Sequence, residues 1–195
     1  TPHWNEYGQS KANLRSGILP PFSGAVNNAE MHSCGAFIRS EIWACITPGR
    51  PDMAAQYAYN DGSIDHGGTG EGTYAEVFCA VLESMAFHES DIRKLVAKSL
   101  TYVPADCALA GAVKMVVREF DAGTSSLAIR DLILEHFRGA PTRLPTAAED
   151  IEKGFGNGPF GFDAPGNVAI VVLSLLEGEN DFGKTVCTAV NCGED

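Results

Sequence analysis

The chain has 195 residues, of which 45% are hydrophobic, and a formal net charge of −11 at pH 7. This length suits one domain with a sizeable core. Such a negative chain repels a phosphate backbone, which argues against a nucleic-acid partner. The longest apolar run, residues 168–176, is too short to cross a bilayer, so we expect no membrane segment. The acidic balance fits a cytoplasmic protein, or one that gathers carboxylates around a cation.

The six cysteines are scattered through the chain without a CxxC pair. This usage indicates free thiols in a reducing compartment, and we expect a cytoplasmic location. The first residue is Thr1 rather than Met, so we expect a processed or partial chain.

The first half of the chain predicts a series of short helices. They are expected over residues 6–16, 36–46, 52–59 and 73–87, with a loop over 63–72. The third helix is expected to end at Asn60-Asp61-Gly62, since these residues favour turns. The fourth places its apolar residues at helical spacing. The acidic residues Glu71, Glu76, Glu83 and Glu89, in and beside this helix, are expected to form a solvated face.

The second half continues the helical pattern. Ser90 is expected to cap a helix to residue 100, Pro104 to begin one to residue 120, and Ser125 or Ser126 to cap one to residue 137. A short helix over 147–153, a glycine-rich stretch over 154–166 and two closing helices follow. No strand pair is apparent, so we predict a single all-α domain over residues 1–195, with function at the helix ends.

The most unusual interior stretch is SIDHGGTGEG, residues 63–72, which contains Asp65 and His66. Its four glycines let the backbone approach another group closely. A helix N-terminus bordered by glycines can hold an anion through free N–H groups. The alternative is a plain helix–helix connection in which His66 caps a helix.

The second glycine-rich stretch, GFGNGPFGFDAPG over residues 154–166, contains three phenylalanines. Aromatic side chains on a pliable loop suit stacking on a flat ring. The alternative is a loop that buries its own aromatic side chains.

The chain closes on Glu194 and Asp195, after a glycine at a helix end. Hard cations take carboxylate oxygens of this kind, whereas the alternative is an ordinary polar terminus. Elsewhere the sequence shows no HExxH spacing and no Ser-His-Asp set with a nucleophile elbow, so it assigns no catalytic residue.

Taken together, these stretches resemble the ADP-ribosylglycohydrolase family. Residues 35–87 are similar to the middle of the family's domain, and residues 156–195 to its later segment with a glycine loop and a metal motif. The opening HWNEYGQ and the PPFSG loop resemble a bacterial branch of the family. The resemblance implies an all-α orthogonal helical bundle and hydrolysis of an ADP-ribosyl N- or O-glycosidic bond.

The resemblance also implies a set of site residues and partners. Substrate contacts are expected from Asp65 and His66, from Gly35, and from the glycine-loop residues Gly156, Asn157, Gly158 and Phe160. Asp195 matches the first aspartate of the late metal motif. The implied cofactor is a pair of Mg²⁺ ions, occasionally Mn²⁺, and the partners are ADP-ribosylated proteins or small molecules containing ADP-ribose.

The chain departs from the family pattern at both ends. The family's early Thr-Asp-Asp ligands would precede Thr1, and the rest of the late motif would follow Asp195. We therefore expect an internal portion of a longer domain, active at full length but inactive as given. The alternatives are a catalytically inactive relative that binds ADP-ribose or serves structurally, and a hydrolase of another nucleoside or glycoside.

Overall fold

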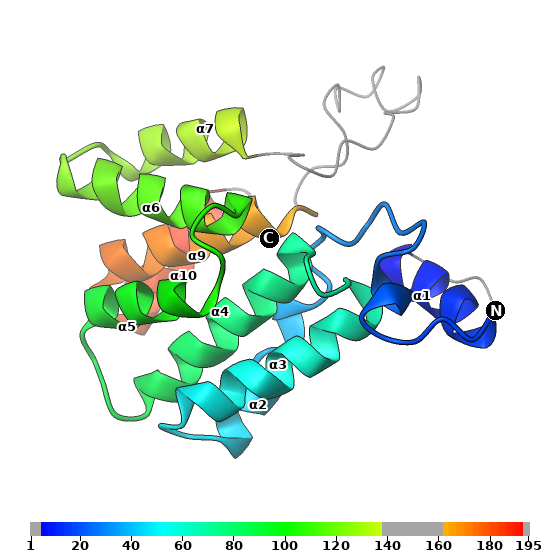
Figure 1. The fold of residues 1–195 in the computed structure, drawn as a ribbon. Coiled ribbons are helices and arrows are strands. Elements are labelled where there is room, and N and C mark those ends of the chain that lie inside the picture. Colours follow the sequence, from blue (N-terminus) through cyan, green and yellow to red (C-terminus); the bar gives the residue numbers. More distant parts are fainter. Residues whose placement is uncertain (1–4, 138–161, 193–195) are drawn as a thin grey trace.

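The computed structural model describes residues 5–137 and 162–192, and this part of the chain contains nine α-helices and no named strand. Three short 3-10 helices, η1 (Phe22–Gly24), η2 (Phe37–Arg39) and η3 (Leu100–Tyr102), lie between them. The α-helices, labelled as in Figure 1, are α1 (Asn5–Arg15), α2 (Glu41–Ile46), α3 (Pro51–Asp65), α4 (Glu71–Ala86), α5 (Ile92–Ser99), α6 (Ala108–Asp121), α7 (Ser126–His136), α9 (Ala164–Gly178) and α10 (Phe182–Asn191). The all-α prediction is confirmed.

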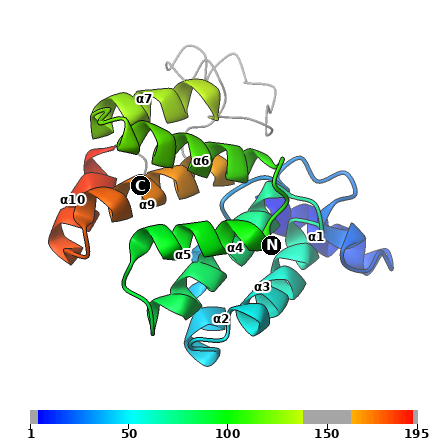
Figure 2. The ribbon, with the colours of Figure 1, turned by 60° about the vertical axis from the view of Figure 1, so that its left-hand side comes forward.

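Helices α4 and α9 form the centre of the bundle. In Figures 1 and 2, α6 and α7 lie above α9, and α2 and α3 lie below α4. Helix α4 packs against α2, α3 and α5, whereas α9 packs against α6, α7 and α10. The two central helices also contact each other, so they join the two halves of the molecule.

The sequences of α4 and α9 explain their central position. Both are apolar around most of their circumference, and a helix of that kind is stable only when neighbours cover it on all sides. Phe78 in α4 and Leu173 in α9 are both enclosed in the same core. Burial of apolar side chains such as these is the main favourable contribution to folding.

Several predicted helix ends are wrong by a few residues. Helix α3 continues through Asn60-Asp61-Gly62 to Asp65. Gly62 suits this position because a Cβ atom would lie 2.7 Å from the Glu76 carboxylate and 3.1 Å from the Thr73 backbone of α4. Close packing of α3 on α4 therefore outweighs the local preference of these residues for a turn.

The helix caps give a mixed outcome. Ser125 caps α7, as one of the two predicted possibilities. Asp91, rather than Ser90, caps α5 by accepting from Arg93 N and Lys94 N, because a carboxylate can serve two N–H groups at once. Helix α6 begins after Cys107 rather than at Pro104. The helix predicted over 36–46 is divided into η2 and α2, and the one predicted over 147–153 lies outside the described residues.

The predicted solvated face of glutamates is wrong. Glu71 and Glu76 are buried, and Glu83 is half-buried. Glu71 accepts hydrogen bonds from Ala108 N (2.8 Å) and Leu109 N (2.9 Å), and so caps α6 from outside that helix. Because α4 is covered on every side, its polar residues are enclosed together with its apolar ones.

No helix in the described part of the chain is long and apolar enough to cross a membrane. All six cysteines fall within this part, and all are free thiols.

Candidate functional site

A set of buried and half-buried polar side chains occupies the junction of α1, α3 and α4. We call it the polar cluster, and its members are Glu6, Ser33, Arg39, Asp61, Asp65, His66 and Glu76. They come from α1, from the segment before η2, from η2 itself, from the end of α3 and from α4. Buried polar groups are stable only when they satisfy one another, so the cluster constrains all of these elements.

Arg39 is the cation at the centre of the polar cluster. Its Nη2 donates to both oxygens of Asp65, at 2.9 and 3.0 Å, and its Nε donates to Asp61 at 2.5 Å. Its Nη1 donates to the carbonyl of Gly35 at 3.0 Å. The planar guanidinium thus fixes η2 against one face of α3.

Asp65 passes this constraint to His66. The Asp65 carboxylate lies 2.6 Å from Nδ1 of the His66 ring. Burial alone would raise the pKa of Asp65, but hydrogen bonds from His66 and Arg39 outweigh it and hold this pKa below its usual value. Asp65 is therefore an ionised acceptor that orients the imidazole.

The opposite edge of the His66 ring faces Ser33 and Glu6. His66 Nε2 lies 3.3 Å from Ser33 Oγ and 3.8 Å from Glu6, and Ser33 Oγ donates to Glu6 at 3.2 Å. The imidazole is therefore held between Asp65 on one side and Ser33 on the other.

The order Ser33–His66–Asp65 has the hydrogen-bond sequence of a nucleophilic triad. However, Ser33 is 2% exposed and His66 is 0% exposed, and the Ser33 hydroxyl is directed at a carboxylate. A nucleophile must reach its substrate, which this serine does not. The arrangement is a positioning network rather than a set of reacting groups.

The C-terminal end of α3 is held in place by side chains from the N-terminal region. Ser10 and Ser23 both donate to the carbonyl of Ile64, at 2.6 and 2.8 Å, and Asn28 donates to that of Asp65 at 2.7 Å. Carbonyls at the end of a helix lack partners within it, so these contacts satisfy them. They also fix the position at which the chain leaves α3 and enters the glycine-rich residues that follow His66.

The glycines near the cluster make room for the protein's own groups. A Cβ atom on Gly72 would collide with the His66 ring, and one on Gly35 would collide with the Glu6 carboxylate. The glycine-rich sequence after His66 thus allows close approach, as predicted, and the described structure shows His66 as one of the groups approached.

The segment before η2 connects the polar cluster to the second glycine-rich stretch. Ser33 forms an antiparallel bridge with Asp163, Cys34 N donates to Phe162 O at 2.8 Å, and Ala164 N donates to His32 O at 3.0 Å. Ser33 therefore contacts both His66 and the described end of that stretch. Phe162 is 47% exposed there.

Of the predicted substrate-binding residues, Gly35, Asp65 and His66 lie together in or beside the polar cluster. The others, Gly156, Asn157, Gly158 and Phe160, lie outside the described residues, as does the predicted metal ligand Asp195.

The predicted anion site at the start of α4 has little room in this structure. Glu71 N donates to His32 Nδ1 at 3.1 Å, and Gly72 N donates to the carbonyl of Met31 at 3.3 Å. These N–H groups are therefore used within the protein. The start of α4 anchors the segment that carries Ser33.

Glu76 is the acid of the cluster with the most altered chemistry. Burial, and next the neighbouring Asp61, raise the pKa of Glu76 to about 9, so the group is neutral near pH 7. Its Oε1 accepts from Trp43 Nε1 at 2.8 Å, whereas its Oε2 has no hydrogen-bond partner among the residues that the structure describes. About two turns further along α4, burial likewise raises the pKa of Glu83 to about 7.

The sequence reasoning missed the contributions of Glu6, Ser33, Arg39, Asp61 and Glu76. For Glu76 a usable signal exists, because its neighbours in α4 are apolar on every side and the helix must be central. The other four are single polar residues in ordinary surroundings. Only the path of the chain brings them to His66.

The described residues do not form a magnesium site. No group of three or more His, Cys, Asp or Glu side chains in residues 5–137 and 162–192 is arranged to hold a metal ion. The carboxylates of Asp61 and Asp65 are already paired with Arg39. A hard cation would need several free oxygens.

The protein is therefore all-helical in its described part, and a polar network holds His66 beside glycine-rich segments. Comparison with protein families identifies the class: the chain matches the ADP-ribosylglycohydrolase family over residues 4–195, and it belongs to this family. Comparisons with curated proteins and with solved structures gave no match. The resemblance read from the sequence is confirmed at the level of the family and of its all-α fold.

Replacing Arg39 by Ala is expected to lower the free energy of unfolding by roughly 3 kcal/mol, because it leaves Asp61 and Asp65 without their cation. Arg39→Lys is expected to recover only part of this, since an ammonium cannot replace the bidentate contact. Urea unfolding measures the change. The control is Arg118→Ala, whose pair with Glu119 is exposed and is expected to change stability by less than about 1 kcal/mol. Equal effects of the two alanine variants would contradict the central role of Arg39.

The raised pKa of Glu76 predicts a pH-dependent stability. Between the ordinary pKa of 4.5 and about 9, the folded state holds a proton that the unfolded state has lost. This group's contribution to stability is therefore full below pH 4.5 and falls as pH rises, by at most about 1.4 kcal/mol per pH unit. Glu76→Gln is expected to flatten the decline of unfolding free energy from pH 5 to 8. The control, Glu135→Gln on the exposed face of α7, is expected to leave the slope unchanged. Part of the decline remains in Glu76→Gln because the pKa of Glu83 is also raised, but a decline as steep as that of the unaltered protein would show that Glu76 is ionised in the fold.

Proposed function

We propose that this chain is part of a hydrolase that cleaves the N- or O-glycosidic bond of an ADP-ribosyl group, releasing ADP-ribose from a protein or a small molecule. The observation that carries the proposal is membership of the ADP-ribosylglycohydrolase family across residues 4–195. The free thiols and acidic charge are consistent with action in the cytoplasm.

The polar cluster supports this proposal by joining the stretches expected to contact substrate. Gly35, Asp65 and His66 meet there, and the Ser33–Asp163 bridge brings in the end of the second glycine-rich stretch. We assign substrate contact to Gly156, Asn157, Gly158 and Phe160, and a supporting position behind them to the enclosed Gly35, Asp65 and His66. Hydrolysis of a glycosidic bond requires its sugar to be held in one orientation, which a rigid support favours.

His66 has a positioning role in this proposal. Its ring is held by Asp65 on one side and by Ser33 on the other, and Arg39 in turn holds Asp65. The ring thereby fixes the Met31–Gly35 segment relative to α3. Movement of that segment by a fraction of an ångström would misplace any ligand bound against it.

We include magnesium dependence in the proposal only because the chain belongs to this family. When bound, such an ion supplies Lewis-acid stabilisation and orientation of substrate hydroxyls or water. Asp195 is the one residue of this chain that we assign to it, and further ligands would have to come from elsewhere in the protein. The described residues supply no such set.

A second candidate is a catalytically inactive relative that binds ADP-ribose or serves structurally. The enclosure of Ser33 and His66, both at 2% exposure or less, is the observation that favours it. Residues with a purely structural role can keep this network without any chemistry.

Activity is predicted for the longest native protein that contains this chain. It should release ADP-ribose from ADP-ribosylated arginine or serine peptides, and a chelator should abolish the release, with recovery on addition of Mg²⁺. Product formation measured by chromatography decides this. Equal rates with and without chelator would remove metal dependence, whereas ADP-ribose binding without turnover would favour the inactive relative. Turnover of other nucleosides or glycosides alone would point to a different hydrolase.

His66→Ala is predicted to weaken ADP-ribose binding by at least tenfold in the same protein, because the segment carrying Gly35 loses its fixed position. Calorimetry measures the affinity, and a melting curve establishes that the variant is folded. His136→Ala, at the exposed end of α7, is the matched control and should bind normally. Normal affinity in a folded His66→Ala protein would exclude the polar cluster from substrate binding.

A further inference from the structure

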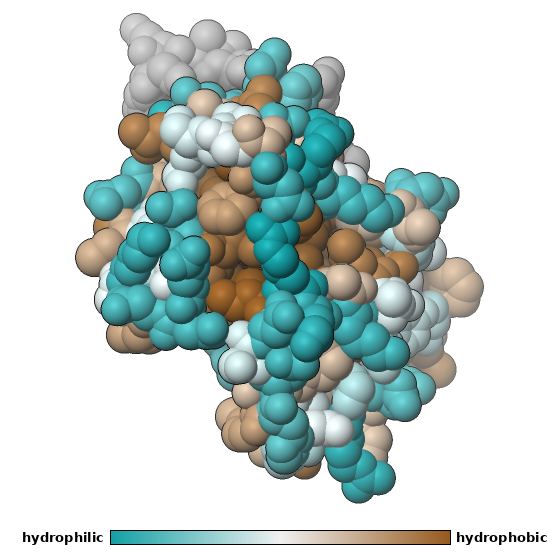
Figure 3. Space-filling model, turned by 90° about the vertical axis from the view of Figure 1, so that its left-hand side faces the viewer, coloured by the Kyte–Doolittle hydropathy of each residue, from teal (hydrophilic) through white to brown (hydrophobic). Residues whose placement is uncertain are grey.

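A groove between α5 and α6 lies apart from the polar cluster and shares no residue with it. It encloses about 430 Å³, a volume in the range of small-molecule sites. Its floor is apolar and is formed by Val96 and Ala97 of α5, Leu100 of η3 and Val117 of α6. On the side of the molecule that Figure 3 faces, recessed apolar surface lies between hydrophilic side chains.

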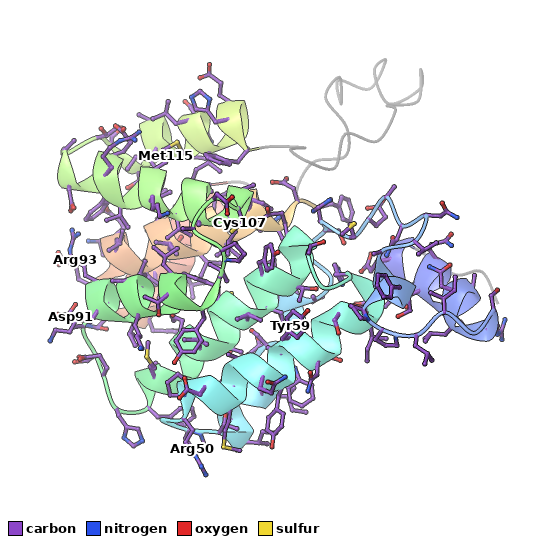
Figure 4. The ribbon with its side chains drawn as sticks, in the orientation of Figure 1. Arg50, Tyr59, Asp91, Arg93, Cys107 and Met115 are labelled. Carbon is purple, nitrogen blue, oxygen red and sulfur yellow. The ribbon has the colours of Figure 1, made fainter. Side chains whose placement is uncertain are left out.

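The two helices that form the groove run in opposite directions. Arg93, near the start of α5, pairs with Asp121, at the end of α6, at 2.6 Å. Leu100, just after the end of α5, lines the groove together with Lys114 from the middle of α6. Figure 4 shows Arg93 at the start of α5, close to Asp91. The groove therefore follows the eight residues of α5, a length of about 12 Å.

The charges along the groove are unlike those of the whole chain. The chain carries a net charge of −11, yet the groove is lined by Arg93, Lys114 and Arg118 against the single acid Asp121. Arg93 and Asp121 neutralise each other at one end. The remaining two cations, Lys114 and Arg118, are four residues apart and lie on the same side of α6. They extend toward the other end of the groove.

Lys114 is the cation most available to a ligand. It is exposed, and no ion pair involving it is found among the described residues. Its Nζ donates to the carbonyl of Ala105 at 2.8 Å, which leaves further N–H donors. Arg118 is 71% exposed and pairs with its neighbour Glu119, so it can add a second, weaker attraction.

We propose that this groove binds a small amphipathic carboxylate, with its aliphatic body on Val96, Leu100 and Val117 and its head group at Lys114. An apolar floor would accept any aliphatic chain of about 12 Å, and the local positive charge selects an anionic one. Charge complementarity within an otherwise acidic molecule is the observation that commits the site to this class of ligand.

Octanoate is the probe that tests the site. Titration into the full chain, followed by calorimetry and by NMR shifts, is expected to show saturable binding, with octan-1-ol at least threefold weaker. Ala97→Trp places an indole in the groove from an exposed position of α5 and should abolish the binding. Lys114→Glu should weaken it roughly tenfold, since it replaces an attraction by a repulsion. Lys11→Glu changes net charge equally from the exposed face of α1 and should leave affinity within twofold.

Several results would overturn the proposal. No saturable binding of octanoate would remove it, and equal affinity for octan-1-ol would remove the head-group site at Lys114. Binding that survives Ala97→Trp would lie elsewhere on the chain. An acidic amphipathic peptide helix should be tested beside octanoate; if the peptide binds in the groove and octanoate does not, the surface serves a protein partner instead. Lys114→Glu keeps the test decisive if Ala97→Trp fails to fold.

Discussion

The ion pair between Arg39 and Asp65 is the interaction on which the arrangement of the site depends. Asp65 is largely buried, and an isolated charge in such a place would be strongly unfavourable. Arg39 compensates it with two hydrogen bonds, and Asp65 then holds His66 with a third. Through this sequence of contacts, η2, the end of α3 and the segment before η2 acquire one fixed relative position. The glycines around the network permit the close approach that it requires.

The fold could be predicted from the sequence further than the site could. Apolar residues at helical spacing predicted most of the helices, because the apolar face that a helix buries against its neighbours is visible in its own sequence. Helix ends were harder. Asn60-Asp61-Gly62 has every local property of a turn, yet α3 continues through it because Gly62 fits against Glu76. The position at which α3 ends is set by its packing on α4, which the local sequence does not reveal.

The polar cluster illustrates the same limit for function. Asp65 and His66 stood out because they adjoin glycines, and Gly35 entered through resemblance to a family. Nothing local marks Glu6, Ser33 or Arg39, which lie 27 to 60 residues from His66 in sequence and reach it only in the folded chain. Glu76 was assigned to solvent by charge alone, although its position in an apolar helix indicated burial. Composition predicts the environment of a helix, whereas the partner of a single polar side chain is set by topology.

The bridge between Ser33 and Asp163 also affects how the chain folds. It joins residues about 130 positions apart, so the chain from α2 to α7 leaves and returns at neighbouring points. Closing a loop of that length carries an entropic cost that local helix contacts do not. Contacts of high sequence separation tend to slow folding, whereas the surrounding helices can form from nearby residues. The contact between the segment before η2 and the second glycine-rich stretch therefore forms only when the two halves of the chain have come together, so its presence reports complete folding.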